Sequence, residues 1–138
     1  MPIVPLSRFA VLFGIVFLAA GIAGFVPGLS PAHMHPDVAI GASSRLALGL
    51  FPVNVLHNAV HLAFGAWGLL AARSGTGALL YARAVAILYA VLTVCGVLPG
   101  LDTLFGLVPL YGNDVWLHAL LAIAAGYVGF VHHRPAHR

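Results

Sequence analysis

Four long apolar runs divide the chain, and each ends at a helix breaker or a polar cluster. The runs cover about residues 9–26, 53–72, 78–98 and 114–131. Each is close to the ~20 residues that an α-helix needs to cross a bilayer. Pro-Gly pairs follow the first and third runs, and polar segments follow the other two, as expected where helices leave hydrocarbon. The pattern predicts an all-α protein, a bundle of four transmembrane helices forming one membrane domain over residues 1–138.

Composition supports this prediction. Hydrophobic residues make up 62% of the chain and charged residues 7%, whereas a typical soluble domain carries about 25% charged residues. So few charges cannot cover a surface that faces water, so lipid is the expected solvent. Arg8 precedes the first run as in a secretory signal peptide, but we expect this run to be a retained span.

Charge placement predicts the orientation of the four spans. One side of the membrane would hold most of the basic residues, namely Arg8, Arg73, Arg83, Arg134 and Arg138. The other side would hold Arg45 and the three acids, Asp37, Asp102 and Asp114. Basic residues concentrate on the cytoplasmic side, so both termini are expected in the cytoplasm of a bacterial cell whose inner membrane holds the protein. The scattered arginines form no nucleic-acid-binding patch, and the single Cys95 excludes a disulfide framework.

The two halves of the chain resemble each other. The segment Gly24–Ser30 closes the first span as Gly96–Asp102 closes the third, each with a central Pro-Gly-Leu. Gly49–Pro52 and Gly106–Pro109 lead into the second and fourth spans, and counting on from them aligns His61 with His118 and His57 with Asp114. Such a repeat would relate two parallel helical hairpins by a pseudo-two-fold axis along the membrane normal.

Polar residues gather on one face of the second span and of the fourth span. Asn54, His57, Asn58 and His61 follow helical spacing i, i+3, i+4, i+7, and Asp114 and His118 lie one turn apart. Ionisable groups inside a membrane almost always face the bundle interior or each other. We therefore expect the histidines and Asp114 to converge between these spans, in the outer third of the bilayer.

Three interpretations of this cluster stay open from the sequence, beside other roles such as proton relay. It can be a hydrogen-bonded structural contact between helices, supported by Asn54, Asn58 and Asn113. His61 and His118 can act as axial ligands of haem or a related macrocycle. His57, His61, Asp114 and His118 can bind a metal ion, because two histidines at i, i+4 form a common zinc-binding spacing.

Two of these stretches also carry a family resemblance. Val53–His61 and Asn113–His118 resemble the His-Asn-x-x-His and Asp-x-x-x-His stretches of an uncharacterised bacterial family of four-helix membrane proteins, known as a domain of unknown function. The resemblance covers most of the chain, from the first span to about Phe130, and implies the fold and the importance of the histidines. Val115 departs from it, since Asn is expected there. No activity follows from the resemblance.

The sequence favours a function without enzymatic chemistry. No nucleophile–base pair, phosphate-binding loop or dinucleotide fingerprint is present. The leading hypothesis is an accessory or scaffold subunit that packs in the lipid bilayer against itself or against a larger respiratory or photosynthetic membrane complex. The alternative is a protein that binds haem, pigment or metal through the histidines, for instance in electron transfer.

Overall fold

The computed structural model describes residues 6–41 and 44–132 of the chain. The fold is mainly helical, with four α-helices, two short strands and a final π-helical segment. In chain order these are α1 (Leu6–Phe25), β1 (Arg45–Ala47), β2 (Phe51–Val53), α2 (Val55–Ala71), α3 (Gly75–Val97), α4 (Asn113–Gly126) and η1 (Tyr127–His132).

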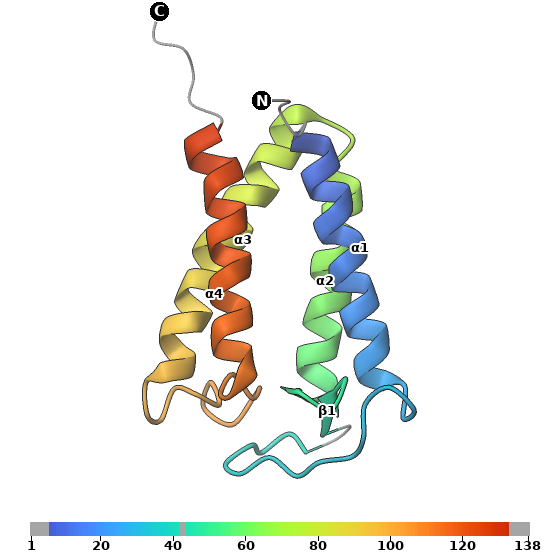
Figure 1. The fold of residues 1–138 in the computed structure, drawn as a ribbon, viewed down its shortest axis with the longest axis vertical. Coiled ribbons are helices and arrows are strands. Elements are labelled where there is room, and N and C mark those ends of the chain that lie inside the picture. The colour runs from blue at the N-terminus through green and yellow to red at the C-terminus, as the bar shows by residue number, and fades with distance from the viewer. Residues whose placement is uncertain (1–5, 42–43, 133–138) are drawn as a thin grey trace, which may run out of the picture.

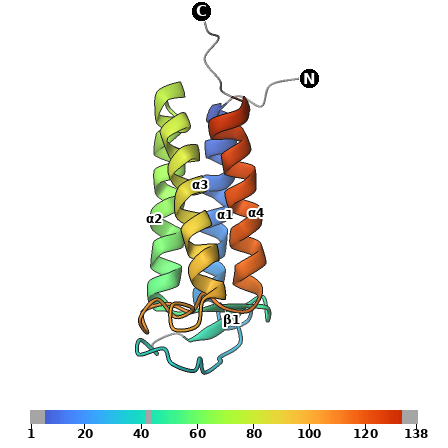
Figure 2. The ribbon, with the colours of Figure 1, turned by 90° about the vertical axis from the view of Figure 1, so that its left-hand side faces the viewer.

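The helices form two antiparallel pairs, α1 with α2 and α3 with α4 (Figures 1 and 2). The start of α1, the connection from α2 to α3 and the end of η1 lie at one end of the bundle. The β-strands and the connection from α3 to α4 lie at the other end, which we call the loop end. The helical pairs thus follow the two halves of the chain.

The purely α-helical prediction was wrong at the loop end, where a small antiparallel hairpin precedes α2. Arg45 pairs with Val53 and Ala47 with Phe51. The hairpin turns through Leu48 and Gly49, whose φ angles of 54° and 72° lie in the left-handed region that glycine adopts readily. Because Val53 belongs to β2, the second helix begins two residues later than the predicted boundary at residue 53.

Three helical segments of the described residues have the length and composition of membrane spans. These are Leu6–Phe25, Gly75–Val97 and the continuous segment Asn113–His132. The helix α2 has 17 residues, which corresponds to about 26 Å at the α-helical rise. Many outward-facing positions on the helices are large and apolar, for example Leu12, Ile87 and Ile123 with 59%, 59% and 68% exposure. These properties indicate a membrane protein.

The charged residues separate between the two ends of the bundle. Arg8 lies in the first turn of α1, and Arg73 lies between α2 and α3. Arg45 of β1 and Asp114 of α4 lie at the loop end. The tail residues of the predicted charge pattern, Arg134 and Arg138, and the nearby His133 and His137 fall outside the described residues.

Glycines allow α1 and α2 to pack at close range. A Cβ atom on Gly65 would lie 2.8 Å from the backbone nitrogen of Leu18, and one on Gly68 would lie 2.9 Å from the carbonyl oxygen of Ala10. A Cβ atom on Gly24 would overlap the side chain of Asn58. Small residues at helix contacts are the usual means of close packing in lipid.

The core between the two pairs is built from aromatic side chains and small residues. Phe17 of α1 lies between Phe64 of α2 and Tyr89 of α3, with ring centroids 6.0 Å and 5.3 Å away. The hydroxyl of Tyr81 donates a hydrogen bond to the carbonyl of Phe64 at 3.2 Å. Aromatic packing and this hydrogen bond together hold α3 against α1 and α2.

Arg83 of α3 holds the α3–α4 pair together near the end of the bundle opposite the loop end. Its Nε donates to the carbonyl of Gly129 at 2.9 Å, and its guanidinium carbon lies 5.2 Å from the ring centre of Phe130. Both partners belong to η1, where wide π-type turns leave carbonyls out of the α-helical pattern. Arg83 therefore satisfies a carbonyl of η1.

Asn54 connects the start of α2 to both loops at the loop end. Its Oδ1 accepts a hydrogen bond from the backbone N–H of His57 at 2.9 Å, which caps the helix. Its Nδ2 donates to the carbonyls of Ile40 and Leu107, at 3.0 Å and 2.8 Å. The fully buried side-chain amide of Asn54 thus fixes the position of α2 along the bundle axis relative to the loop after α1 and the loop before α4.

We predict that Gly65→Ala lowers the free energy of unfolding by about 1–3 kcal/mol, because the new methyl group forces α1 away from α2. Gly126→Ala is the matched control. Its Cβ atom would lie 3.8 Å from that of Ala86, an ordinary contact, and alanine favours the helix. Unfolding in mixed micelles would measure both. Equal stability of the two variants would contradict the close packing described here.

We also predict that Asn54→Ala lowers the free energy of unfolding by about 2 kcal/mol or more, since it removes the helix cap and leaves two carbonyls without a partner. Asn113→Ala serves as the control, because the hydrogen bonds of Asn113 are exposed and their loss should cost less than about 1 kcal/mol. The same micelle titration would distinguish them, and an Asn54 variant as stable as the Asn113 variant would argue against the anchoring role.

Candidate functional site

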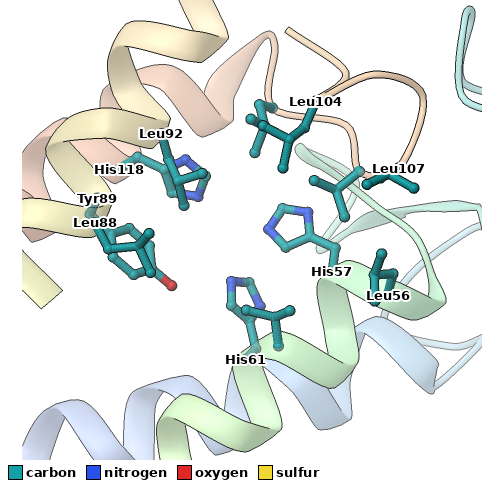
Figure 3. Close-up of a pocket in the computed structure, with 12 residues that line it drawn as sticks. Leu56, His57, His61, Leu88, Tyr89, Leu92, Leu104, Leu107 and His118 are labelled. Carbon is teal, nitrogen blue, oxygen red and sulfur yellow. The ribbon is translucent and has the colours of Figure 1, made fainter. Parts of the chain in front are cut away.

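Three histidines meet between α2 and α4, close to the loop end. His57 and His61 lie one turn apart on α2, and His118 lies on the second turn of α4. The ring centroid of His57 lies 4.6 Å from that of His61 and 6.0 Å from that of His118. One nitrogen of each ring lies within 4.8 Å of one nitrogen of each of the others. Figure 3 shows the three imidazoles facing the same space.

Asp114 lies beside His57 but outside this triangle of nitrogens. Its Oδ2 is 3.7 Å from Nδ1 of His57, which is longer than a direct hydrogen bond. Asp114 is 2% exposed, and within residues 6–41 and 44–132 this histidine is its only ion-pair partner. The predicted set of four ligands is therefore arranged as three histidines with a carboxylate behind one of them.

The cluster is short of hydrogen bonds for its depth. The Nδ1 atoms of His57, His61 and His118 and Oδ2 of Asp114 are buried, and none has a hydrogen-bond partner in the described structure. Buried polar atoms in proteins are normally paired, and in lipid no water replaces the lost partner. The arrangement therefore has unused capacity to bind a cation or a polar group.

Aromatic rings hold two of the imidazoles in place. Phe17 stacks on His61 with a centroid distance of 5.8 Å, and Tyr89 meets His118 edge-on at 5.0 Å. In Figure 3 the hydroxyl of Tyr89 points toward the space between the histidines. Side chains locked by packing in this way keep a binding site in a defined geometry.

Two apolar cavities flank the cluster, and His61 and His118 line both of them. The larger has a volume of about 240 Å³ and lies between α2, α3 and the loop before α4. The smaller, of about 180 Å³, lies between α1, α4 and the β-hairpin. His57 lines the larger cavity and Asp114 the smaller one. The histidines thus separate two cavities whose other lining residues are apolar except for Tyr89 and Asp114.

The predicted asparagines have other contacts. Asn54 holds the loops, and Asn58 lies against Gly24 of α1, where no larger residue would leave it room. Asn113 donates to the carbonyl of Leu50 at 3.1 Å and accepts from the indole of Trp116 at 3.0 Å. None of the three has a side-chain hydrogen bond to an imidazole ring among the bonds of the described residues; the bond between Asn54 and His57 involves the backbone N–H of His57. Val115, where the resemblance implied Asn, packs against Gly96.

Sequence reasoning identified neither the role of Tyr89 nor the contact that His35 makes. Tyr89 lies in the middle of an apolar run, whereas tyrosines of membrane helices usually lie near the ends, and that position was an available signal. His35 belongs to the long loop after α1, and its Nε2 lies 3.0 Å from the carbonyls of both Arg45 and Val53. It fixes this loop to the hairpin. No local pattern in the sequence indicates that contact.

The three nitrogens suit a metal ion better than a macrocycle. Zinc–nitrogen bonds of about 2.0–2.1 Å place the nitrogens of a tetrahedral site about 3.3 Å apart, so small side-chain rotations would bring this triangle into bonding range. A porphyrin between His61 and His118 would extend sideways over the position of His57, which lies near both rings. Both cavities are also below the ~300 Å³ at which pockets for larger organic ligands begin. The geometry therefore favours a metal ion over haem.

Comparison with known proteins places the chain in a family. No curated protein and no solved structure matches it. One family model covers the chain from the start of α1 to η1, including both histidine-bearing helices. The protein therefore belongs to the family described as Domain of unknown function (DUF4383), whose model matches residues 7–131.

Proposed function

We propose that the protein is a membrane-embedded metal-binding protein that holds one divalent transition-metal ion between His57, His61 and His118. The observation that supports this most directly is the triangle of nitrogens within 4.8 Å of one another. Imidazole nitrogen suits zinc, copper, iron and nickel, whereas calcium and magnesium prefer oxygen ligands. Three protein ligands leave one position open, as in many zinc sites that bind a further molecule.

Asp114 is the proposed orienting residue of the site. Histidine ligands commonly donate their second ring nitrogen to a carboxylate, which fixes the tautomer and raises the basicity of the ligating nitrogen. Nδ1 of His57 faces Oδ2 of Asp114, so Nε2 of His57 is the proposed ligand atom. The ion would in turn offset the negative charge of a carboxylate held away from water.

The proposed membrane arrangement has four spans, with α2 as the shortest. Its length is at the lower limit of the ~17–25 residues found for spanning helices, and Asn54 fixes where it starts. The arginines near the end of the bundle opposite the loop end support an orientation with both termini in the cytoplasm of a bacterial cell. A pseudo-two-fold axis between the helical pairs would relate His57 to Asp114 and His61 to His118.

The proposed role is binding rather than catalysis. An accessory subunit within a larger respiratory or photosynthetic complex remains compatible with it, because the apolar flanks of the helices can pack against lipid or against another membrane protein. A bound ion between α2 and α4 would hold the two helical pairs together. The metal site and the accessory role are thus not exclusive.

We predict that purified protein in lipid nanodiscs binds one Zn²⁺ or Co²⁺ per chain. His118→Ala should abolish this stoichiometric binding, and Asp114→Asn should weaken it about 10–100-fold, the usual effect of losing an orienting partner. Titration calorimetry with elemental analysis measures both. The tail histidines His132, His133 and His137 are replaced with Asn in all samples, so that they do not bind the added ion.

His33→Ala is the matched control, because His33 is exposed in the loop after α1 and should leave the affinity unchanged. Circular dichroism of each variant reports whether the helices are retained. A folded His118 variant that binds the ion as tightly as the parent would exclude the proposed site.

The orientation gives a separate prediction. In a Cys95→Ala background, a cysteine at Ser74, between α2 and α3, should react with a membrane-impermeant maleimide only after the cells are opened. A cysteine at Gly28, in the loop after α1, should react in intact spheroplasts, since a Cβ atom there meets nothing within 4 Å. The reverse labelling pattern would show that the termini face outward.

A further inference from the structure

The larger cavity has features of a ligand site that the metal ion alone does not use. Three imidazoles and Tyr89 line it, together with leucine and valine residues. Figure 3 shows these polar groups around the space, with Leu92, Leu104 and Leu107 also beside it. Small-molecule sites commonly combine apolar walls with a few converging polar groups in this way.

The cavity reaches the outer surface of the bundle beside α2. Val60 of α2 and Leu107 of the loop before α4 line it and are also exposed on the outer surface, at 37% and 43%. With α2 crossing the membrane, this opening faces the acyl chains. A ligand would therefore enter from the bilayer and would have to be lipid-soluble.

The size of the cavity limits the part of the ligand that it encloses. Benzene occupies an engineered protein cavity of about 150 Å³, so about 240 Å³ accommodates one substituted six-membered ring. A larger fused or macrocyclic system does not fit. The rest of the molecule would leave through the opening as an apolar tail.

Charge limits the chemistry of the ring. No arginine lines the cavity, and the carboxylate of Asp114 just behind the histidines offsets part of the charge of a bound ion, so a multiply charged phosphate headgroup would not be neutralised there. Imidazole and phenol N–H and O–H groups donate to neutral oxygens, and a metal ion on the histidines would take such an oxygen as its fourth ligand.

We infer that this cavity binds the ring of a neutral, lipid-soluble quinone, with one ring oxygen beside the histidine-bound ion and the tail in the bilayer between α2 and α3. The inference rests on the proposed metal site, whose open position the oxygen would complete. It concerns binding alone and includes no electron-transfer step.

The test uses Co²⁺-loaded protein in nanodiscs and a decyl-tailed benzoquinone. Binding in excess of that to empty nanodiscs should saturate at one quinone per chain, and the visible bands of Co²⁺ should shift as its coordination changes. Val60→Phe should weaken binding about tenfold or more, because the added ring takes space that the quinone needs. Val91→Phe is the control, since Val91 of α3 is 52% exposed and lies outside the cavity lining.

Decanoate, with a carboxylate on a similar tail, distinguishes a ring site from a general site for lipid tails. Failure of decanoate to compete would support the inference. Competition by decanoate as effective as that of the quinone, or quinone uptake that does not saturate, would overturn it. Co²⁺ is counted before the quinone is added. Bound Co²⁺ without saturable quinone uptake therefore removes this inference and leaves the metal site. Saturable uptake without bound Co²⁺ removes the metal site and, with it, the placement of the ring oxygen beside an ion.

Discussion

Polar side chains that leave water for the interior of a membrane bundle must be satisfied by one another, because hydrocarbon offers no hydrogen bonds. In this protein the constraint falls on three imidazoles and one carboxylate between α2 and α4. The contacts of the surrounding residues can be understood from it: aromatic rings fix the imidazoles, and Asn54 fixes the start of α2. The remaining unpaired nitrogens are the physical reason to expect a bound ion.

The loop end is organised by side chains that bond to backbone carbonyls. His35 and Arg45 join the loop after α1 to the hairpin, with Nη1 of Arg45 donating to the carbonyl of Ser30 at 2.9 Å. The backbone N–H of Ala39 donates to the carbonyl of Gly106 at 2.8 Å, which joins the two loops. These contacts satisfy backbone groups that irregular segments would otherwise leave unpaired. They also build a cover next to the histidine cluster.

The positions of the helices and of the histidines could be predicted because each depends on local periodicity. Apolar runs and breakers placed the helices to within a few residues, and i, i+4 spacing put His57 and His61 on one face. The hairpin could not be predicted, since strands of three residues leave no alternating pattern and Pro52 argues against a strand. The role of His35 depends on tertiary contacts between distant segments, which no local pattern encodes, whereas the position of Tyr89 in the middle of an apolar run was a local signal.

The fit between Gly24 and Asn58 affects the histidines although neither residue touches an ion. Asn58 lies between His57 and His61 in sequence and occupies the space that a side chain at position 24 would fill. A residue with a Cβ atom there would displace the side chain of Asn58 or push α1 away from α2. Either change would alter the packing of the helix turn that carries both imidazoles. The absence of a methyl group on α1 is thus part of what sets the position of the histidines on its neighbour.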